Sequence, residues 1–292
     1  MKVALLEPYS VNNCGLHSYT SNVSKGLKAE GIDVIDINLG YLGFLKAQKY
    51  IPNDVDLIHN VSSYYYTHGK LPKPSVMTVY DTIPWDHPEW MSLKSNLYHR
   101  AFGMRSIRKY DKLIAISCNT ARDLRQHKIK QPIEIIHPGI NEIFFDEYKD
   151  DLEDHLWNDL KFDLYVGGFD PRKNVDLLIN WWSDSKYARG EFLILAGGNG
   201  WNNKNTYKLI EQTDGVLCIR SPSIETLFRL YHNCLDFYYP SLYEGYGLPL
   251  AEAMACKCNV HHFGNSSLNE VKPLHWKDQI KKIIRVYDSL LE

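Results

Sequence analysis

The feature that most constrains the fold of this 292-residue chain is a repeated alternation of apolar, β-branched segments with segments of helical periodicity. In the first half the pattern predicts strands at 3–7, 33–38, 56–61, 76–81, 113–117 and 133–137, and helices at 16–29, 95–109 and 119–127. It then restarts, with strands at 163–166, 192–196, 215–219, 234–240 and 260–263, and helices at 175–182, 205–211, 224–232, 248–256 and 276–291. Strands that alternate with helices favour parallel sheets covered on both faces, so the sequence predicts an α/β protein.

A shift in composition separates the two series of strands. Residues 149–159 are acidic and irregular, and we predict the interdomain linker there. The prediction is therefore an N-terminal Rossmann-like domain over 1–148 and a C-terminal one over 160–292, facing each other across a cleft. Ligands of doubly wound sheets bind at the carboxyl ends of the strands. The apolar face of the amphipathic helix at 276–291 is expected to pack against another part of the protein, and the N-terminal domain is one candidate partner.

Composition excludes several other classes of protein. Hydrophobic residues make up 44% and charged residues 23% of the chain, as in globular proteins. No apolar run approaches the roughly 20 residues that cross a bilayer. The segment from Lys2 to Glu7 predicts a first strand and not a signal peptide. Six cysteines without a disulfide or zinc framework indicate reduced thiols, and so a cytoplasmic location.

Positive charge is concentrated between Lys94 and Lys130, although the whole chain carries a formal net charge of −2. Ten Lys and Arg residues stand there against two Asp residues, a local excess of eight. Helical spacing places four apolar residues on one face, Leu93, Leu97, Met104 and Ile107. The adjoining face carries Lys94, Arg105, Arg108 and Lys109. Two interpretations stay open for this basic face, a solvated surface or a binding surface for phospholipid headgroups or nucleic acid.

Two glutamates, Glu244 and Glu252, stand eight positions apart across a glycine-rich turn. The segment 234–240 before them is typical of a buried strand, and Pro249 suits the first turn of a helix. A helix start exposes backbone N–H groups that attract phosphate. If all the intervening residues were helical, the two glutamates would be roughly 12 Å apart along the axis. The alternative is a pair of solvated glutamates at a helix start.

A second polar turn follows the first strand of the second half. Gly167 and Gly168 would let a phosphate approach the backbone, and Arg172 and Lys173 come directly after them. A guanidinium offers a fork of donors and an ammonium a compact positive charge, which together suit a diphosphate.

Together these segments resemble the family 4 retaining glycosyltransferases of the GT-B fold, with their E-x7-E signature. The resemblance implies that Glu252 binds the ribose hydroxyls of a nucleotide-sugar and that Glu244 faces the transferred sugar. It places the diphosphate on Arg172 and Lys173, which with Glu244 and Asp81 form the catalytic set. The remaining donor-binding positions that it implies are Gly168, Gly198, Gly245, Tyr246, Gly247 and Leu248.

The acceptor side of the resemblance lies in the first half. The stretch 79–90 resembles the family's segment at a strand end, with Tyr80 in place of the family's histidine and Asp81 retained. Tyr80 can hydrogen-bond a sugar but is a poor base at pH 7. Gly15 and His17 lie in the loop where the family has an acceptor-proximal turn. His59 and His87 are further candidates for acceptor contacts, or ordinary histidines.

No metal and no further cofactor is expected beside the nucleoside-diphosphate sugar, with UDP preferred to GDP. The one D-x-D triplet, Asp54-Val-Asp56, precedes a strand in the first half and is interpreted as a loop. Cys256 and Cys258 lack a second pair and are expected to pack at a helix end. Arg172, Lys173 and the helix start after Gly247 would then stabilise the leaving diphosphate.

The leading hypothesis is a cytoplasmic, peripherally membrane-associated enzyme that glycosylates a polysaccharide or a lipid-linked glycan. A second hypothesis has the basic face bind DNA, with hydroxymethylated bases as acceptors. A nucleotide-sugar epimerase and an inactive nucleotide-sugar-binding module are the remaining alternatives.

Overall fold

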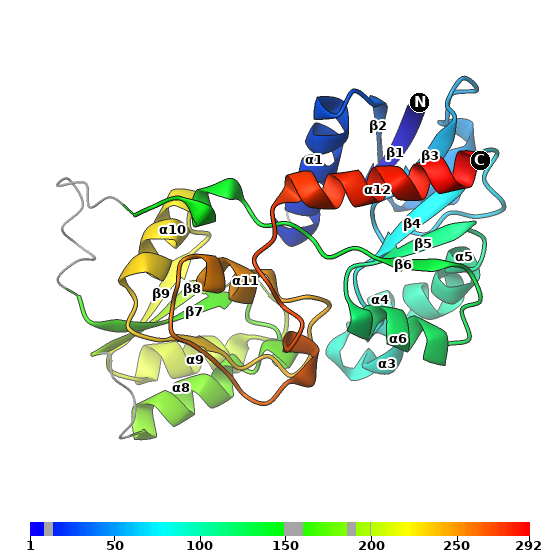
Figure 1. The fold of residues 1–292 in the computed structure, drawn as a ribbon. Coiled ribbons are helices and arrows are strands. Elements are labelled where there is room, and N and C mark those ends of the chain that lie inside the picture. The colour runs from blue at the N-terminus through cyan, green and yellow to red at the C-terminus, as the bar shows by residue number, and fades with distance from the viewer. Residues whose placement is uncertain (9–13, 149–159, 186–190, 199) are drawn as a thin grey trace. The chain divides into compact units, whose positions relative to one another are not determined.

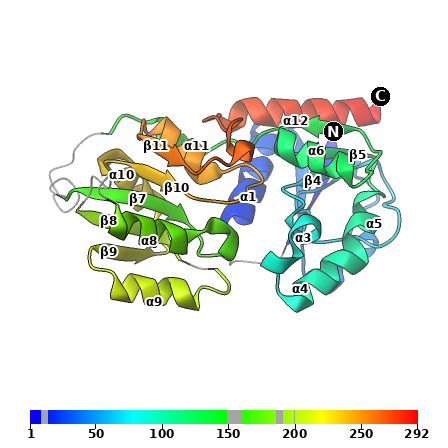
Figure 2. The same ribbon diagram turned by 90° about the horizontal axis from the view of Figure 1, so that it is seen from below.

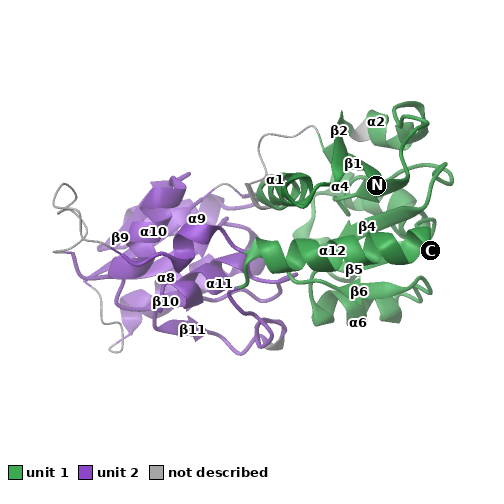
Figure 3. Cartoon of the chain, turned by 45° about the horizontal axis from the view of Figure 1, so that its top comes forward, with its two compact units in different colours: residues 1–139, 274–292 green, residues 140–273 purple. Residues whose placement is uncertain are grey.

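The computed structural model describes residues 1–8, 14–148, 160–185, 191–198 and 200–292 (Figure 1). These residues form two compact units, which Figure 3 shows in separate colours. Unit 1 comprises 1–139 together with 274–292, and unit 2 comprises 140–273. The division thus falls between Gly139 and Ile140, whereas the expected linker at 149–159 lies outside the described residues. The chain returns to unit 1 for its final helix.

Unit 1 is built on a six-stranded parallel sheet of order β2-β1-β3-β4-β5-β6. Its strands are β1 Lys2–Pro8, β2 Asp33–Leu39, β3 Leu57–Asn60, β4 Ser75–Val79, β5 Lys112–Ala115 and β6 Ile133–Ile135. Its α-helices are α1 Cys14–Ala29, α2 Tyr41–Leu45, α3 Ile83–Asp86, α4 Leu93–Tyr98, α5 Met104–Ile107, α6 Cys118–Gln126 and α12 Trp276–Leu291. The central strands β3 and β4 are buried along their whole length, as expected when helices cover both faces of a parallel sheet.

Unit 2 repeats the scheme with a five-stranded parallel sheet of order β11-β10-β7-β8-β9. The strands are β7 Phe162–Gly167, β8 Phe192–Gly197, β9 Val216–Arg220, β10 Phe237–Tyr239 and β11 Val260–His262. The helices are α8 Val175–Asp184, α9 Lys204–Gln212, α10 Ile224–Asn233 and α11 Leu248–Ala255. Helices α8 and α9 cover one face of the sheet, and α10 and α11 cover the other (Figures 1 and 2). The predicted class, two Rossmann-like α/β domains, is confirmed.

The terminal helix α12 is held in unit 1 by packing and by one buried hydrogen bond. On the packing side, Gly26 of α1 has no side chain, and a Cβ there would lie 2.4 Å from Cγ1 of Ile280. The polar contact joins Tyr287 of α12 to His59 of β3, whose Nδ1 lies 2.6 Å from the tyrosine hydroxyl oxygen. Burial lowers the pKa of His59 to about 3, so its ring is neutral. His59 is therefore a core residue, and the structure does not support its candidacy for an acceptor contact.

The helix predicted over 95–109 is interrupted. A π-helical segment at His99–Gly103 separates α4 from α5. This wider turn buries His99, whose Nδ1 lies 2.6 Å from the hydroxyl oxygen of Tyr66, and it places Gly103 where a Cβ would clash with Trp85. The predicted apolar face is broken as a result: Ile107 is buried, but Leu93 and Leu97 are 88% and 71% exposed.

Candidate functional site

A buried ion cluster stands at the carboxyl end of the sheet in unit 2. The Glu244 carboxylate accepts hydrogen bonds from Lys173 Nζ at 2.5 Å and from Arg172 Nη1 at 3.0 Å. The Tyr239 hydroxyl donates to the same carboxylate at 3.0 Å and accepts from Lys173 Nζ at 3.0 Å. Glu244 and Lys173 are only 6% and 7% exposed. The three residues that the sequence singled out as the charged core of the site are thus brought together.

Burial and the neighbouring opposite charge shift the pKa values of Glu244 and Lys173 in opposite directions. Burial by itself raises the pKa of Glu244, but Arg172 and Lys173 lower it more strongly, and the net value is about 2. For Lys173, burial lowers the pKa and the attraction of Glu244 raises it, with a net lowering. Each charge is therefore tolerated inside the protein because the opposite charge lies beside it.

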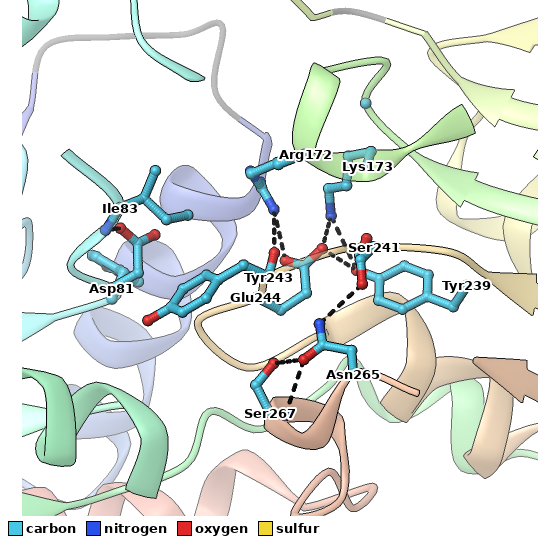
Figure 4. A network of polar contacts seen from close by, with 12 residues as sticks. Asp81, Ile83, Arg172, Lys173, Tyr239, Ser241, Tyr243, Glu244, Asn265 and Ser267 are labelled. Atoms are coloured by element: carbon cyan, nitrogen blue, oxygen red, sulfur yellow. Dashed lines mark hydrogen bonds and ion pairs between the residues drawn. The ribbon is translucent and has the colours of Figure 1, made fainter. Parts of the chain in front are cut away.

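Hydrogen bonds to backbone carbonyls hold the loops that carry this cluster (Figure 4). Arg172 and Lys173 lie in a short 3₁₀ turn, Pro171–Lys173, that follows β7. The Leu242 amide donates to the Arg172 carbonyl at 2.8 Å, and Arg172 Nη1 donates to the Tyr243 carbonyl at 3.2 Å. Asn265 Nδ2 donates to the Ser241 carbonyl at 2.9 Å, which anchors the loop after β10 from its other side. These contacts thus hold the side chains of the two cations and the glutamate in fixed positions relative to one another.

Helix α11 begins at Leu248, so only the second half of the segment between the two glutamates is helical. The distance of roughly 12 Å expected for a fully helical segment is therefore not the geometry of this site. Gly247 precedes the helix with φ +99°, a conformation that L side chains rarely adopt. Glu252 follows inside α11, half-buried, and its Oε2 accepts a 2.9 Å hydrogen bond from the Tyr231 hydroxyl. Burial raises the pKa of Glu252 to about 7.

The predicted glycine turns lie at the ends of two adjacent strands. Gly168 directly follows β7, and its carbonyl accepts from the Tyr165 hydroxyl at 2.8 Å. Gly198 directly follows β8, and its carbonyl accepts from the Tyr207 hydroxyl at 2.6 Å. Just before these turns the backbones of β7 and β8 approach each other closely. A Cβ on Gly197 would lie 2.1 Å from the Gly167 carbonyl oxygen. Two tyrosines that sequence reasoning did not select thus fix these turns.

The loop before α11 contains the predicted donor-binding positions Gly245, Tyr246, Gly247 and Leu248. The Tyr246 ring is buried, and its hydroxyl donates to the Lys272 carbonyl at 2.8 Å and accepts from the Lys272 amide at 3.1 Å. The side chain of Tyr246 therefore anchors the loop, which leaves its backbone as the part that can serve a ligand.

In unit 1, two of the predicted acceptor-side residues follow β4. The Tyr80 hydroxyl donates inward to the Val61 carbonyl at 2.5 Å, so the expected contact from this hydroxyl to a sugar is not supported. Asp81 is buried; one carboxylate oxygen accepts from the Ile83 amide at 3.0 Å and the other from the Tyr64 hydroxyl at 2.5 Å. Tyr64, which the sequence did not indicate, stacks on Tyr80 with ring centroids 6.3 Å apart. An aromatic wall thus stands beside Asp81.

The remaining candidates of unit 1 are less informative. Gly15 and His17 lie in the first turn of α1, and the structure describes no side chain for His17. His87 stacks on Trp90 and lies 3.1 Å from the Glu89 carboxylate, as in an ordinary loop. The D-x-D triplet is also a loop, since Lys2 Nζ donates to Asp54 at 2.6 Å and the Lys2 amide donates to Asp56 at 2.7 Å.

Comparison with known protein families gives two matches that follow each other along the chain. Residues 15–143 match the family described as Glycosyltransferase Family 4, and residues 139–262 match the one described as Glycosyl transferases group 1. Together they cover residues 15–262, the larger part of each unit. They indicate a glycosyltransferase of the GT-B fold and of family 4 type.

Individual relatives of similar sequence also carry glycosyltransferase names. An uncharacterized glycosyltransferase of Methanocaldococcus jannaschii is 25% identical over 69% of this chain and 54% of its own length. The O-antigen chain mannosyltransferase B of Escherichia coli is 36% identical over 37% of this chain and 30% of its own length. This chain thus spans about half, or less, of the length of these two relatives.

Solved structures share the fold. Sucrose-phosphate synthase from Thermosynechococcus elongatus superposes with a TM-score of 0.70 and 16% identity, covering 99% of this chain and 90% of its own. Anabaena HepE, solved in complex with UDP-glucose, gives a TM-score of 0.65 and 16% identity over 100% of this chain and 92% of its own. Of the helices within the described ranges, none is both long and apolar enough to cross a membrane.

We predict that Glu244→Gln lowers the free energy of unfolding by about 3–5 kcal/mol, because it leaves the buried Lys173 ammonium without its carboxylate. The double variant Glu244→Gln/Lys173→Met should recover part of this loss. Denaturant unfolding followed by circular dichroism measures both, with Glu225→Gln, at an exposed glutamate, as the control. Additive losses in the double variant would contradict a coupled ion pair.

Glu252 should make the protein less stable as the pH rises from about 4.5 to 7. Over this range the unfolded chain has released the Glu252 proton while the folded protein still holds it, since the folded pKa is about 7. The free energy of unfolding falls by about 1.4 kcal/mol for each pH unit in this range. Below pH 4.5 Glu252 has no such effect, because it is protonated in both the folded and the unfolded state. We therefore expect the stability of Glu252→Gln relative to the parent to increase between pH 4.5 and 7. A difference in the free energy of unfolding between Glu252→Gln and the parent that stays constant from pH 4 to 8 would contradict the raised pKa.

Proposed function

We propose that this chain is a retaining glycosyltransferase that moves a sugar from a nucleoside-diphosphate sugar to a hydroxyl group of a polysaccharide or lipid-linked glycan. The observation that carries the proposal is the convergence of Arg172 and Lys173 on Glu244, beside the start of α11 at the carboxyl end of a parallel sheet. Ligands of doubly wound folds bind at this end.

The two cations suit the diphosphate of the donor. Glu244 pairs with both of them, and a bound diphosphate would take over part of this pairing. The dipole of α11, whose N-terminal end lies beside the cluster, adds partial positive charge from a second direction. Negative charge grows on the diphosphate as the glycosidic bond breaks, and these groups would stabilise it without a metal ion.

Glu252 suits the ribose of the nucleotide. A carboxylate accepts two hydrogen bonds from the neighbouring hydroxyls of a ribose, and such bonds favour its ionised form. Ribose binding would therefore lower the raised pKa of Glu252. We propose UDP as the nucleotide and a hexose or pentose as the sugar. UDP-glucose in Anabaena HepE supports the first choice, and the mannosyltransferase name of the Escherichia coli relative supports a glycan as acceptor.

The proposed reaction needs no protein nucleophile. The bond between the sugar C1 and the diphosphate oxygen breaks, and a bond from the acceptor oxygen to C1 forms on the same face. The acceptor proton passes to the oxygen of the leaving phosphate. Tyr80 is then not required as a base, which agrees with its inward-facing hydroxyl. We place the acceptor at Asp81 and the ring of Tyr64, because a carboxylate and an aromatic face suit a sugar.

The basic face of unit 1 would bring the enzyme to its acceptor. Lys94, Arg105, Arg108 and Lys109 are exposed. Leu93 and Leu97, one turn apart on α4, are exposed on the same helix as Lys94. Apolar side chains next to cations suit an anionic membrane, whereas duplex DNA offers them no apolar partner. We therefore propose a peripheral location at the cytoplasmic surface of a membrane, with DNA as the competing interpretation.

Arg172→Ala should lower turnover by about 10²–10³-fold and weaken donor binding much less, because the guanidinium matters most when charge develops on the diphosphate. Steady-state kinetics and calorimetry with UDP-glucose and related donors separate the two effects. Lys208→Ala, at an exposed lysine of the same unit, is the matched control.

The same assay examines the alternatives. An epimerase would convert the donor sugar without an acceptor, and an inactive module would bind the donor without turnover. EDTA should leave the rate unchanged, and a loss restored by manganese would contradict the metal-free proposal.

Reversal of Arg105, Arg108 and Lys109 to glutamate should weaken binding to phosphatidylglycerol vesicles by about 100-fold at low salt, at about 1 kcal/mol for each lost cation near the surface. Hydrolysis of the donor by water should be unchanged. A matched control reverses three other exposed lysines of unit 1, Lys46, Lys49 and Lys70.

Equal vesicle binding by the two triple variants would contradict a dedicated membrane face. A salt slope for duplex DNA that falls by about three in the first variant alone would favour the DNA interpretation instead.

A further inference from the structure

A hollow of about 390 Å³ lies on unit 2, away from the ion cluster. Its walls come from α8, from β10 and from the edge strand β11, which lie close together in Figure 3. Trp181 packs against Tyr238 and Phe263, with ring centroids 5.1 and 5.8 Å apart. His261 stacks on Tyr238 at 4.9 Å. The volume lies in the range of small-molecule sites, and aromatic faces dominate the lining.

A buried carboxylate organises the polar part of this hollow. Asp236 is 1% exposed, and His261 Nε2 lies 2.8 Å from its Oδ1. Because a carboxylate only accepts, Nε2 of His261 donates the proton in this contact. Asn259 Nδ2 donates to the same oxygen of Asp236. Two polar side chains are thus held in fixed orientations beside the aromatic rings.

This chemistry selects among possible ligands. A phosphate or a carboxylate would meet Asp236, and none of the described residues that line the hollow is a lysine or arginine. A purely apolar ligand would bury Asn259 and His261 without partners, which is costly. A neutral sugar ring has apolar faces that pack on aromatic side chains and hydroxyls that hydrogen-bond to amide and imidazole groups.

The hollow is separate from the donor site although both use β10. Successive residues of a strand point to opposite faces of the sheet. Tyr239 reaches Glu244 and Lys173, whereas its neighbour Tyr238 packs on Trp181 of α8. A sugar in the hollow would therefore not be the reacting sugar.

We propose that this hollow binds a neutral oligosaccharide, as a second glycan subsite that holds a part of a chain remote from the reacting end. The proposal rests on the glycan acceptor of the proposed function and adds a site for it. It gives the enzyme a preference for long acceptors, because a second contact raises the effective concentration of the chain at the active site.

Binding without a donor tests the proposal directly. We expect saturation-transfer NMR and titration calorimetry to detect mannohexaose, maltohexaose or both on the full chain. Phe263→Ala removes one aromatic wall and His261→Ala one polar contact, and each should weaken this binding about tenfold. Leu217→Ala is the matched control, because Leu217 is similarly exposed on β9 at the opposite edge of the same sheet.

Retained UDP binding in all variants shows that unit 2 is folded. Absence of binding by both hexasaccharides overturns the proposal, and so does binding that Phe263→Ala and His261→Ala leave unchanged. Failure of sugar transfer, or of UDP binding by the parent chain, would count against the proposed function and not against this subsite.

Discussion

The buried pairing of one carboxylate with two cations is the interaction on which the site in unit 2 depends. A lysine as buried as Lys173 is unfavourable unless a carboxylate lies beside it, and Glu244 supplies that carboxylate. Conversely, Glu244 stays ionised because Arg172 and Lys173 outweigh its burial. The cluster is thus a structural element. Under the proposed function it would also serve the donor, since an anion that enters would compete for cations that are already oriented.

Parallel topology explains how this pairing arises. Lys173 and Glu244 are 71 residues apart in the chain, but β7 and β10 are adjacent and parallel, so the loops after them leave the sheet at the same edge. The same geometry places Gly168 and Gly198 at the ends of neighbouring strands. In unit 1 it brings Asp81, which follows β4, to Tyr64, which follows β3. The polar side chains of the two candidate sites therefore lie at the carboxyl ends of the strands in each sheet.

The sequence alone determined much of this protein. Apolar, β-branched strands alternating with amphipathic helices can be buried only as parallel α/β sheets, which is why the two Rossmann-like domains were predicted correctly. Arg172, Lys173 and Glu244, which the sequence predicted to form one charged site, do meet, because glycines and charges at strand ends leave a local signal in the chain. The role of Glu252 in donor binding stays a prediction. Cys256 packs at the end of α11, as expected from the missing second cysteine pair.

Tertiary structure decided what depends on contacts between distant segments. The burial of His59 against Tyr287 and the inward hydrogen bond of Tyr80 to Val61 carry no local pattern. The sequence therefore left His59 open as a candidate for acceptor contacts and placed Tyr80 on the acceptor side. The π-helical turn at His99–Gly103 interrupts the helix that periodicity predicted over 95–109, and Leu93 and Leu97 of the predicted apolar face are exposed. The hollow around Tyr238 joins a helix and two strands from three parts of the chain. A sequence pattern reports which residues prefer burial or a turn, but only the packed chain determines which side chains meet, because the free energy of a contact depends on both partners.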